Sequence, residues 1–198
     1  MRIDVLTLFP GLFQGYLDES LVSKARAKGI LDIRPRNLRD WAEGVHKVVD
    51  DRPYGGGPGM VLMCAPVFRA VEQIQAEGEP AKVLMLTPAG ERLTQTRVAQ
   101  LAAEPRLILL CGRYEGVDER VSEFLADREI SVGDFVLSGG ELPAAILVDE
   151  VGLSGRGIGA QLGARVGGEA ERAEHQHNHP APEPRGDLQH ARPRGEPP

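Results

Sequence analysis

The sequence has few residues that bind metals or cross-link a chain: its 198 residues include 2 cysteines and 5 histidines. Cys64 and Cys111 cannot form the framework of several disulfides that is typical of small secreted domains, so we expect free thiols and a cytoplasmic location. His46 is the only histidine in the first 150 residues, which argues against a zinc site there. We therefore predict a site without a metal.

Long apolar runs and an excess of positive charge are also absent. No stretch approaches the roughly 20 residues that span a bilayer, and the N-terminal MRIDVLTLFP lacks the order of a signal peptide. The 23 Lys and Arg residues stand against 29 Asp and Glu residues, which gives a formal net charge of −6. This balance excludes a surface that is basic throughout, but it leaves room for a local basic patch.

Aromatic residues stop before residue 151, where the composition changes. Glycine, proline, arginine and alanine fill more than half of residues 151–198. Such a segment has too little apolar surface to offset an ordering cost of about 1–2 kcal/mol per residue. We expect a folded domain over 1–151 and a disordered tail over 152–198. In this tail the alternating His175, His177 and His179 suit either a metal site or a solvated polar tract.

The hydropathy pattern of the first 150 residues alternates between strands and helices. It predicts strands at 2–9, 31–34, 82–86, 106–111 and 129–132, and helices at 12–27, 66–75, 94–103, 118–125 and 141–151. The strands are apolar throughout, as in a parallel sheet covered on both faces. The expected fold class is α/β, with a mainly parallel sheet flanked by helices.

Three glycine-containing turns follow strands of this sheet, at 87–90, 112–116 and 133–140. In open α/β sheets ligands bind outside the carboxyl ends of the strands. Glycine there allows close approach of the main chain or a positive φ. We expect the turns to form one pocket of main-chain donors and acceptors, which suits an adenine and a ribose better than a metal.

Common nucleotide and nucleophile motifs do not fit. The glycines of 55–59 are not followed by the Gly-Lys-Ser/Thr of a phosphate loop, because Met60 comes next. No G-x-G-x-x-G follows the first strand, and Ser138 does not lie in a G-x-S-x-G elbow.

Three segments carry a family resemblance: VDDRPYGGGPGM at 49–60, LCGRYEGVDER at 110–120 and SVGDFVLSGGELP at 131–143. In this order they resemble the bacterial tRNA (guanine-N1)-methyltransferases, and the likeness runs from Met1 to about Val151. The resemblance implies a SPOUT-type α/β fold with a deep trefoil knot, and a homodimer with active sites at the subunit interface. It also implies methylation of the guanine just 3′ of the anticodon (position 37) in tRNA.

The same resemblance implies a cofactor, S-adenosyl-L-methionine, held in the knot. The implied cofactor-binding residues are Leu86, Thr87, Pro88, Gly112, Tyr114, Glu115, Gly116, Val132, Gly133, Asp134, Phe135, Val136, Leu137, Gly139, Gly140 and Pro143. Candidate substrate-binding residues are Asp50, Arg52 and Glu115. The alternatives are an ion pair of Asp50 or Asp51 with Arg52 that holds the loop, and a solvated carboxylate for Glu115.

Methyl transfer to guanine N1 requires alignment of the methyl group, removal of the N1 proton and a partner for the charge that develops on O6. In the family an Arg and an Asp beyond the knot serve the last two roles. Here Val151 is followed by Gly152-Leu153-Ser154-Gly155, without the expected Arg, and Asp187 stands in a different context. The catalytic residues therefore stay unassigned, and the helical tRNA-binding domain has no counterpart.

We hypothesise that the tail is translated out of frame, with a natural disordered tail as the alternative. A non-catalytic module that binds the cofactor or RNA is the alternative function.

Three further features each have two interpretations. Six cations lie close together in the sequence and suit either phosphate contacts or a solvated face: Lys24, Arg26, Lys28, Arg34, Arg36 and Arg39. Trp41 could stack on a base, although a half-buried packing role is the favoured interpretation. Cys111 is expected to be a buried small hydrophobe rather than a nucleophile.

Overall fold

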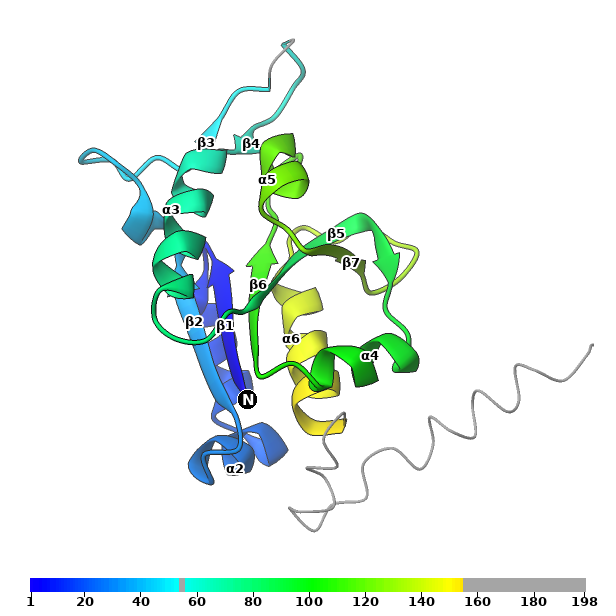
Figure 1. Cartoon of the computed structure of the whole chain (residues 1–198). Helices are drawn as coiled ribbons and strands as arrows, with labels where there is room; N and C mark the ends of the chain where they lie inside the picture. Colours follow the sequence, from blue (N-terminus) through cyan, green and yellow to red (C-terminus); the bar gives the residue numbers. More distant parts are fainter. Residues whose placement is uncertain (54–55, 155–198) are drawn as a thin grey trace, which may run out of the picture. The chain divides into compact units, whose positions relative to one another are not determined.

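A five-stranded parallel sheet forms the centre of the protein, in the order β2-β1-β6-β5-β7 (Figure 1). The computed structural model describes residues 1–53 and 56–154. The strands are β1 (Arg2–Thr7), β2 (Asp32–Asn37), β5 (Lys82–Arg92), β6 (Arg106–Cys111) and β7 (Arg128–Ser131), with a separate antiparallel pair of β3 (Asp50–Asp51) and β4 (Val61–Leu62). The predicted fold class is confirmed.

Helices cover both faces of this sheet. They are the 3-10 helices η1 (Pro10–Phe13) and η2 (Leu38–Trp41), the α-helices α1 (Gln14–Leu17), α2 (Ser20–Ala27), α3 (Cys64–Gln75), α4 (Gln95–Ala102), α5 (Glu119–Phe124) and α6 (Glu141–Asp149), and the π-helix η3 (Glu150–Ser154). One core packs α2, α4 and α6 against the sheet, and the other packs α3 against the opposite face (Figure 1). Within β6, Leu107 and Leu109 belong to the first core, whereas Ile108 and Leu110 belong to the second. This division explains why the strand is apolar from Leu107 to Cys111.

Two elements differ from the pattern-based expectation. The predicted helix 12–27 is divided into η1, α1 and α2, and Ser20 has a positive φ of 56° where α2 begins. The predicted strand 82–86 continues to Arg92 through a bulge, because Leu86 and Glu91 both pair with Ile130. Hydropathy does not detect such a bulge, since 87–90 reads as a turn.

The chain packs beyond the predicted boundary at residue 151. Val151 and Leu153 are buried in the first core, and a Cβ on Gly152 would lie 2.9 Å from Leu31 Cδ1. The remainder of the predicted tail, including the alternating histidines, lies outside the described residues. In the part of the chain that is described, no helix is long and apolar enough to cross a membrane.

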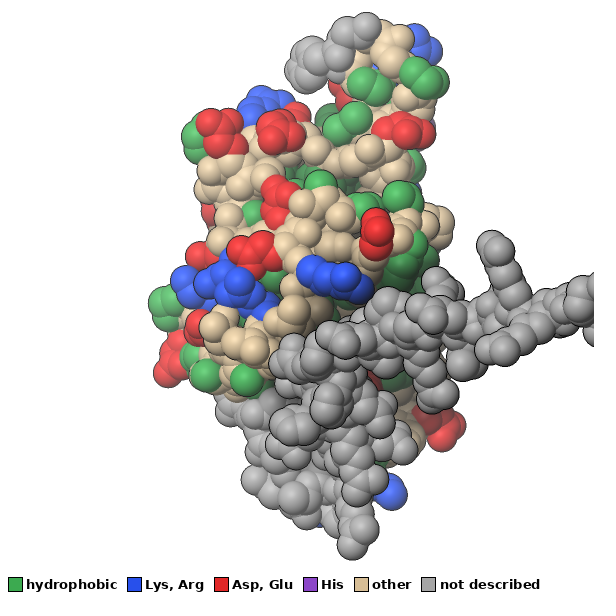
Figure 2. All heavy atoms as spheres, turned by 90° about the vertical axis from the view of Figure 1, so that its right-hand side faces the viewer, with side chains coloured by type: hydrophobic (Ala, Val, Ile, Leu, Met, Phe, Trp, Pro, Cys, Tyr) green, Lys and Arg blue, Asp and Glu red, His purple; other side chains and the backbone are tan. Residues whose placement is uncertain are grey.

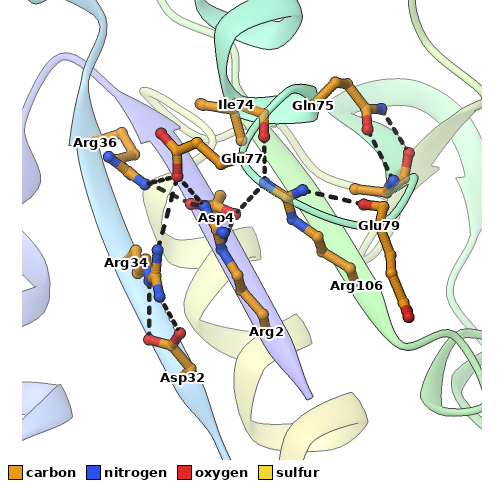
Figure 3. A network of polar contacts seen from close by, with 11 residues as sticks. Arg2, Asp4, Asp32, Arg34, Arg36, Ile74, Gln75, Glu77, Glu79 and Arg106 are labelled. Atoms are coloured by element: carbon orange, nitrogen blue, oxygen red, sulfur yellow. Dashed lines mark hydrogen bonds and ion pairs between the residues drawn. The ribbon is translucent and has the colours of Figure 1, made fainter.

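A buried polar network lies on β1, β2 and β6 beside the C-terminal end of α3 (Figure 3). Asp4 is fully buried and makes ion pairs with Arg2 (2.8 Å), Arg36 (3.2 Å) and Arg106 (3.4 Å). Glu77 contacts Arg2 and Arg36. Each guanidinium thus has a carboxylate partner, which offsets the cost of burying the Asp4 charge. We call this set of five residues the Asp4 network.

Candidate cofactor pocket

The three predicted segments line one cavity of about 460 Å³: 112–116 and 133–140 follow the carboxyl ends of β6 and β7, whereas 87–90 lies at the bulge within β5 and is not a separate turn. Their predicted meeting is therefore confirmed. The implied cofactor residues that line the cavity are Leu86, Thr87, Pro88, Gly112, Tyr114, Glu115, Gly116, Val132, Gly133, Phe135, Val136, Leu137, Gly139, Gly140 and Pro143. Asp134 belongs to the same loop but is not among the lining residues.

The loop after β6 holds an unusual backbone conformation. Tyr114 has a φ of 63°, which is costly for an aromatic residue and persists only where neighbouring structure enforces it. Main-chain hydrogen bonds supply that enforcement: Glu115 N donates to Met60 O (3.1 Å), and Leu62 N donates to Gly116 O (3.0 Å). Met60 and Leu62 are thereby joined to the cavity loop, and the Glu115 side chain lies over Gly59, where a Cβ would be 2.3 Å from Glu115 Cγ.

The adjacent glycines Gly139 and Gly140 permit a close approach between two loops. A Cβ on Gly140 would lie 2.6 Å from Cys111 Cα, and a Cβ on Gly139 would lie 2.3 Å from Arg113 Nε. Gly140 N donates to Gly112 O at 2.9 Å. Gly140 is therefore required by contact with the main chain at the end of β6, and Gly139 by contact with the Arg113 side chain.

A buried carboxylate fastens these two loops. Glu141, the first residue of α6, is 4% exposed and accepts hydrogen bonds from Thr7 Oγ1 (2.8 Å) and Arg113 Nε (3.2 Å). Its Oε2 lies 2.8 Å from Arg113 Nη2. Arg113 also donates to Ser138 O (3.1 Å) and stacks over Phe9, 4.7 Å from its ring centroid. We call Thr7, Arg113 and Glu141 the Glu141 clasp.

Sequence reasoning missed the clasp and several lining residues. Ten residues that line the cavity are absent from the predicted cofactor set: Met85, Ala89, Arg113, Val117, Glu119, Ser122, Glu129, Ile130, Ser131 and Ser138. Arg113 stood inside a quoted motif, which was an available signal. Its pairing with Glu141, 28 positions along the chain, has no local sequence signal.

The cavity lining carries more carboxylates than cations. Glu115, Glu119 and Glu129 line it, and Arg113, the cation among the described lining residues, is paired with Glu141. Figure 2 shows acidic and basic side chains interspersed on the face turned to the right in Figure 1, without a continuous basic field over its described part. Burial, with a smaller effect of the Glu141 charge, raises the pKa of the Cys111 thiol well above its usual value, which favours the expected inert role.

The other substrate candidates lie outside this cavity. Asp50 pairs with Leu62 in the β3–β4 ladder, and neither it nor Arg52 lines the pocket. Arg52 N donates to Asp51 Oδ1 (2.7 Å), but no ion pair joins these side chains within the described structure. Trp41 Nε1 donates to Gln73 Oε1 (2.6 Å) and its ring packs against the second core, which supports the packing interpretation.

Four arginines of the basic segment are engaged within the molecule. Their partners are Asp18 for Arg26, Asp32 for Arg34, Asp4 and Glu77 for Arg36, and the Lys47 carbonyl for Arg39. These contacts favour a structural role over phosphate binding. In 1–53 and 56–154 no group of three or more metal-ligating side chains converges.

Comparisons with known proteins agree with the resemblance. The family model described as tRNA (Guanine-1)-methyltransferase TrmD matches residues 1–165, so the match continues past Val151. A tRNA (guanine-N(1)-)-methyltransferase of Geobacillus kaustophilus is 54% identical over 76% of this chain and 62% of its own length. One of Chloroflexus aggregans is 53% identical over 76% of this chain and 60% of its own length.

A solved structure supports the same assignment. The tRNA (m1G37) methyltransferase from Aquifex aeolicus superposes with a TM-score of 0.72 at 42% identity, covering 78% of this chain and 69% of that one. The chain matches about three fifths of the length of the curated relatives above. On the sequence match and the shared fold together, the chain belongs to the tRNA (guanine-1)-methyltransferase family.

Proposed function

We propose that this chain binds S-adenosyl-L-methionine in the cavity and directs its methyl group to N1 of the guanine 3′ of the anticodon, position 37, in tRNA. The observation that carries the proposal is the meeting of three glycine-containing segments in one cavity, of which two follow the carboxyl ends of β6 and β7 and the third is the bulge within β5. Family membership supplies the reaction class, since its relatives are named for this activity.

The residues present fit this cofactor. A volume of about 460 Å³ lies within the usual range for small-molecule sites. A Cβ on Gly116 would meet no atom within 4 Å, so main-chain groups there face open space. The carboxylates of Glu115, Glu119 and Glu129 suit a cationic sulfonium compound better than an anionic one.

The cofactor supplies a methyl group that is already activated, so the task of the protein is alignment. Main-chain groups of the 112–116 and 133–140 loops would hold the adenosine part. Glu115, which lines the cavity beside Gly59, would contact the guanine. The described residues thus bind and orient, whereas no counterpart of the family's Arg and Asp is assigned. We therefore expect slow methyl transfer by this chain.

Finer features of the proposal follow from the family. We infer a threaded trefoil knot, and the contact of Gly140 with the end of β6 supports a close passage of these segments. A homodimer is supported by exposed apolar side chains on η1 and α6, namely Leu12, Leu142 and Ile146. We assign tRNA as the partner and the cytoplasm as the location.

The test is calorimetry of the full chain with S-adenosylmethionine, followed by a methyl-transfer assay on a tRNA transcript with guanine or adenine at position 37. We expect one site per chain, with slow transfer that depends on the guanine. Absence of binding would overturn the proposal. Binding without any transfer would favour the non-catalytic module instead, and turnover equal to that of the Geobacillus relative would refute the expectation of slow transfer.

A further inference from the structure

Glu141 is a buried charge that touches the cavity walls without lining the cavity. It is 4% exposed, and its carboxylate reaches β1 through Thr7 Oγ1 (2.8 Å) and the 112–116 loop through Arg113. As the first residue of α6, it directly follows the 133–140 loop. One side chain therefore connects the end of a central strand to two of the three loops that form the pocket.

The contacts of Arg113 extend this connection. Its guanidinium binds Glu141 with two nitrogens and donates a third contact to Ser138 O at 3.1 Å. Because Gly139 has no side chain, the Arg113 guanidinium can lie where a Cβ would otherwise be. The two loops are thus joined by charge-assisted contacts whose geometry is fixed by a planar donor group, which is more restrictive than a flexible ammonium would be.

Thr7 anchors the carboxylate from the other side. Its hydroxyl donates to Glu141 Oε1 and accepts from Phe9 N at 3.0 Å, so both of its hydrogen-bonding directions are used. Phe9 in turn carries the stacked Arg113. The contacts therefore form a ring from Thr7 through Glu141, Arg113 and Phe9 back to Thr7. A substitution of Thr7 or Glu141 should shift the loop that carries Arg113, although neither side chain would contact a ligand.

On these contacts, and resting on the proposed function, we propose that Glu141 is a positioning residue for the cofactor cavity, acting through Arg113 and Thr7 to set the 112–116 loop against the 133–140 loop. A positioning group should change ligand affinity beyond any effect on stability. A carboxylate that only stabilises the fold should leave the affinity of the folded molecule unchanged.

The Asp4 network supplies a matched control. Asp4 is 0% exposed and is also paired with arginine, but none of its partners lines the cavity. The experiment measures S-adenosylhomocysteine binding to the full chain by calorimetry for the wild type, Glu141→Gln and Asp4→Asn. Circular dichroism establishes the folded fraction of each variant, so that affinities are compared per folded molecule.

We expect Glu141→Gln to weaken S-adenosylhomocysteine binding by about ten-fold or more, as for other directly coupled contacts, and Asp4→Asn to change it by less than about two-fold, as for a site with no shared partners. If Glu141→Gln does not fold, Thr7→Val and Thr7→Ser decide, because serine restores the hydroxyl and should restore the affinity. Equal effects of Glu141→Gln and Asp4→Asn, or of the two Thr7 variants, would overturn the inference. Failure of the wild type to bind would instead overturn the proposed function.

Discussion

Both the Asp4 network and the Glu141 clasp bury a carboxylate against guanidinium groups, but they differ in what they join. The partners of Asp4 lie on β1, β2 and β6, so the network ties regular strands together. The partners of Glu141 include Arg113, in the loop between β6 and α5 that makes isolated bridges to β4. The same chemistry thus stabilises a scaffold in one place and fixes the geometry of loops in the other.

Backbone strain follows the same division. Tyr114, with its positive φ, and the tight approach of Gly140 to Cys111 both lie beside the clasp. The strands that carry the Asp4 network pair in continuous parallel register. Strain that persists beside a cavity is typical of a site held in a binding geometry.

The largest expected effect is loss of stability at the Asp4 network. Asp4→Asn leaves the buried Arg106 without its carboxylate partner and leaves Arg2 and Arg36 with Glu77 alone, so the free energy of unfolding should fall by about 3–5 kcal/mol. Urea denaturation measures it. Asp32→Asn, in an exposed pair with Arg34, is the control and should cost at most about 1 kcal/mol. Similar losses for both variants would contradict the structural role of the network.

Adding a Cβ at Gly140, where the 133–140 loop meets the end of β6, should affect both the stability of the fold and the binding of ligand. Gly140→Ala forces a Cβ to within 2.6 Å of Cys111 Cα, a main-chain atom that cannot rotate away. Overpacking of this kind costs about 1–3 kcal/mol, and we expect weaker S-adenosylhomocysteine binding as the loops separate. Gly15→Ala, where a Cβ meets nothing within 4 Å, is the matched control. Wild-type behaviour of Gly140→Ala would show that the loops are not in contact.

A smaller effect is expected at the start of α5, beside the cavity loop. Asp118 caps this helix by accepting a hydrogen bond from Arg120 N (3.1 Å). Asp118→Ala should lower the free energy of unfolding by about 1 kcal/mol. Asp118→Asn preserves a capping oxygen and should recover most of this loss in thermal denaturation. An equal loss for both variants would assign the stabilisation to charge rather than to the cap.

The smallest expected effect is a change in how the free energy of unfolding depends on pH, through Glu77 of the Asp4 network. Burial alone would raise the pKa of Glu77, but hydrogen bonds and charge from Arg2 and Arg36 outweigh it and lower the pKa below its ordinary value of 4.5. The unfolded chain therefore binds a proton at Glu77 more readily. The stabilisation of the fold by the ionised Glu77 is fully present above about pH 5 and is lost as the pH falls through the folded-state pKa of Glu77.

Glu77→Gln should consequently show a shallower loss of stability between about pH 5 and pH 3. Urea midpoints at a series of pH values test this expectation. Glu79→Gln is the control, since the Glu79 side chain makes no ion pair in the described structure. An unchanged slope for Glu77→Gln would indicate that the carboxylate titrates as it does in the unfolded chain.

The sequence predicts regular elements well where side chains alone determine them. The strand 106–111 was predicted with its correct bounds because every residue is buried and both ends carry turn-forming residues. The strands β3 and β4 were not predicted, since such short pairs depend on main-chain contacts with the 114–118 loop. The bulge at 87–90 was missed because Gly90 is set by the approach of β7, with a Cβ only 2.5 Å from Ile130 N.

Prediction of the site had a similar limit. Glycine turns at strand ends indicated the cavity, because glycine leaves room for close main-chain approach. They did not indicate that Gly139 and Gly140 approach Arg113 and Cys111. Long-range pairings such as Glu141 with Thr7, 134 positions apart, leave no periodic signal in one sequence.

Hydrogen–deuterium exchange of the full chain, with and without S-adenosylhomocysteine, tests the central claim most directly. The three loops at 87–90, 112–116 and 133–140 should exchange more slowly when the ligand is bound, while the strand residues that carry the Asp4 network should be unchanged. Unchanged exchange in the loops, or slowing confined to the Asp4 network, would contradict a cofactor site at the carboxyl ends of the strands.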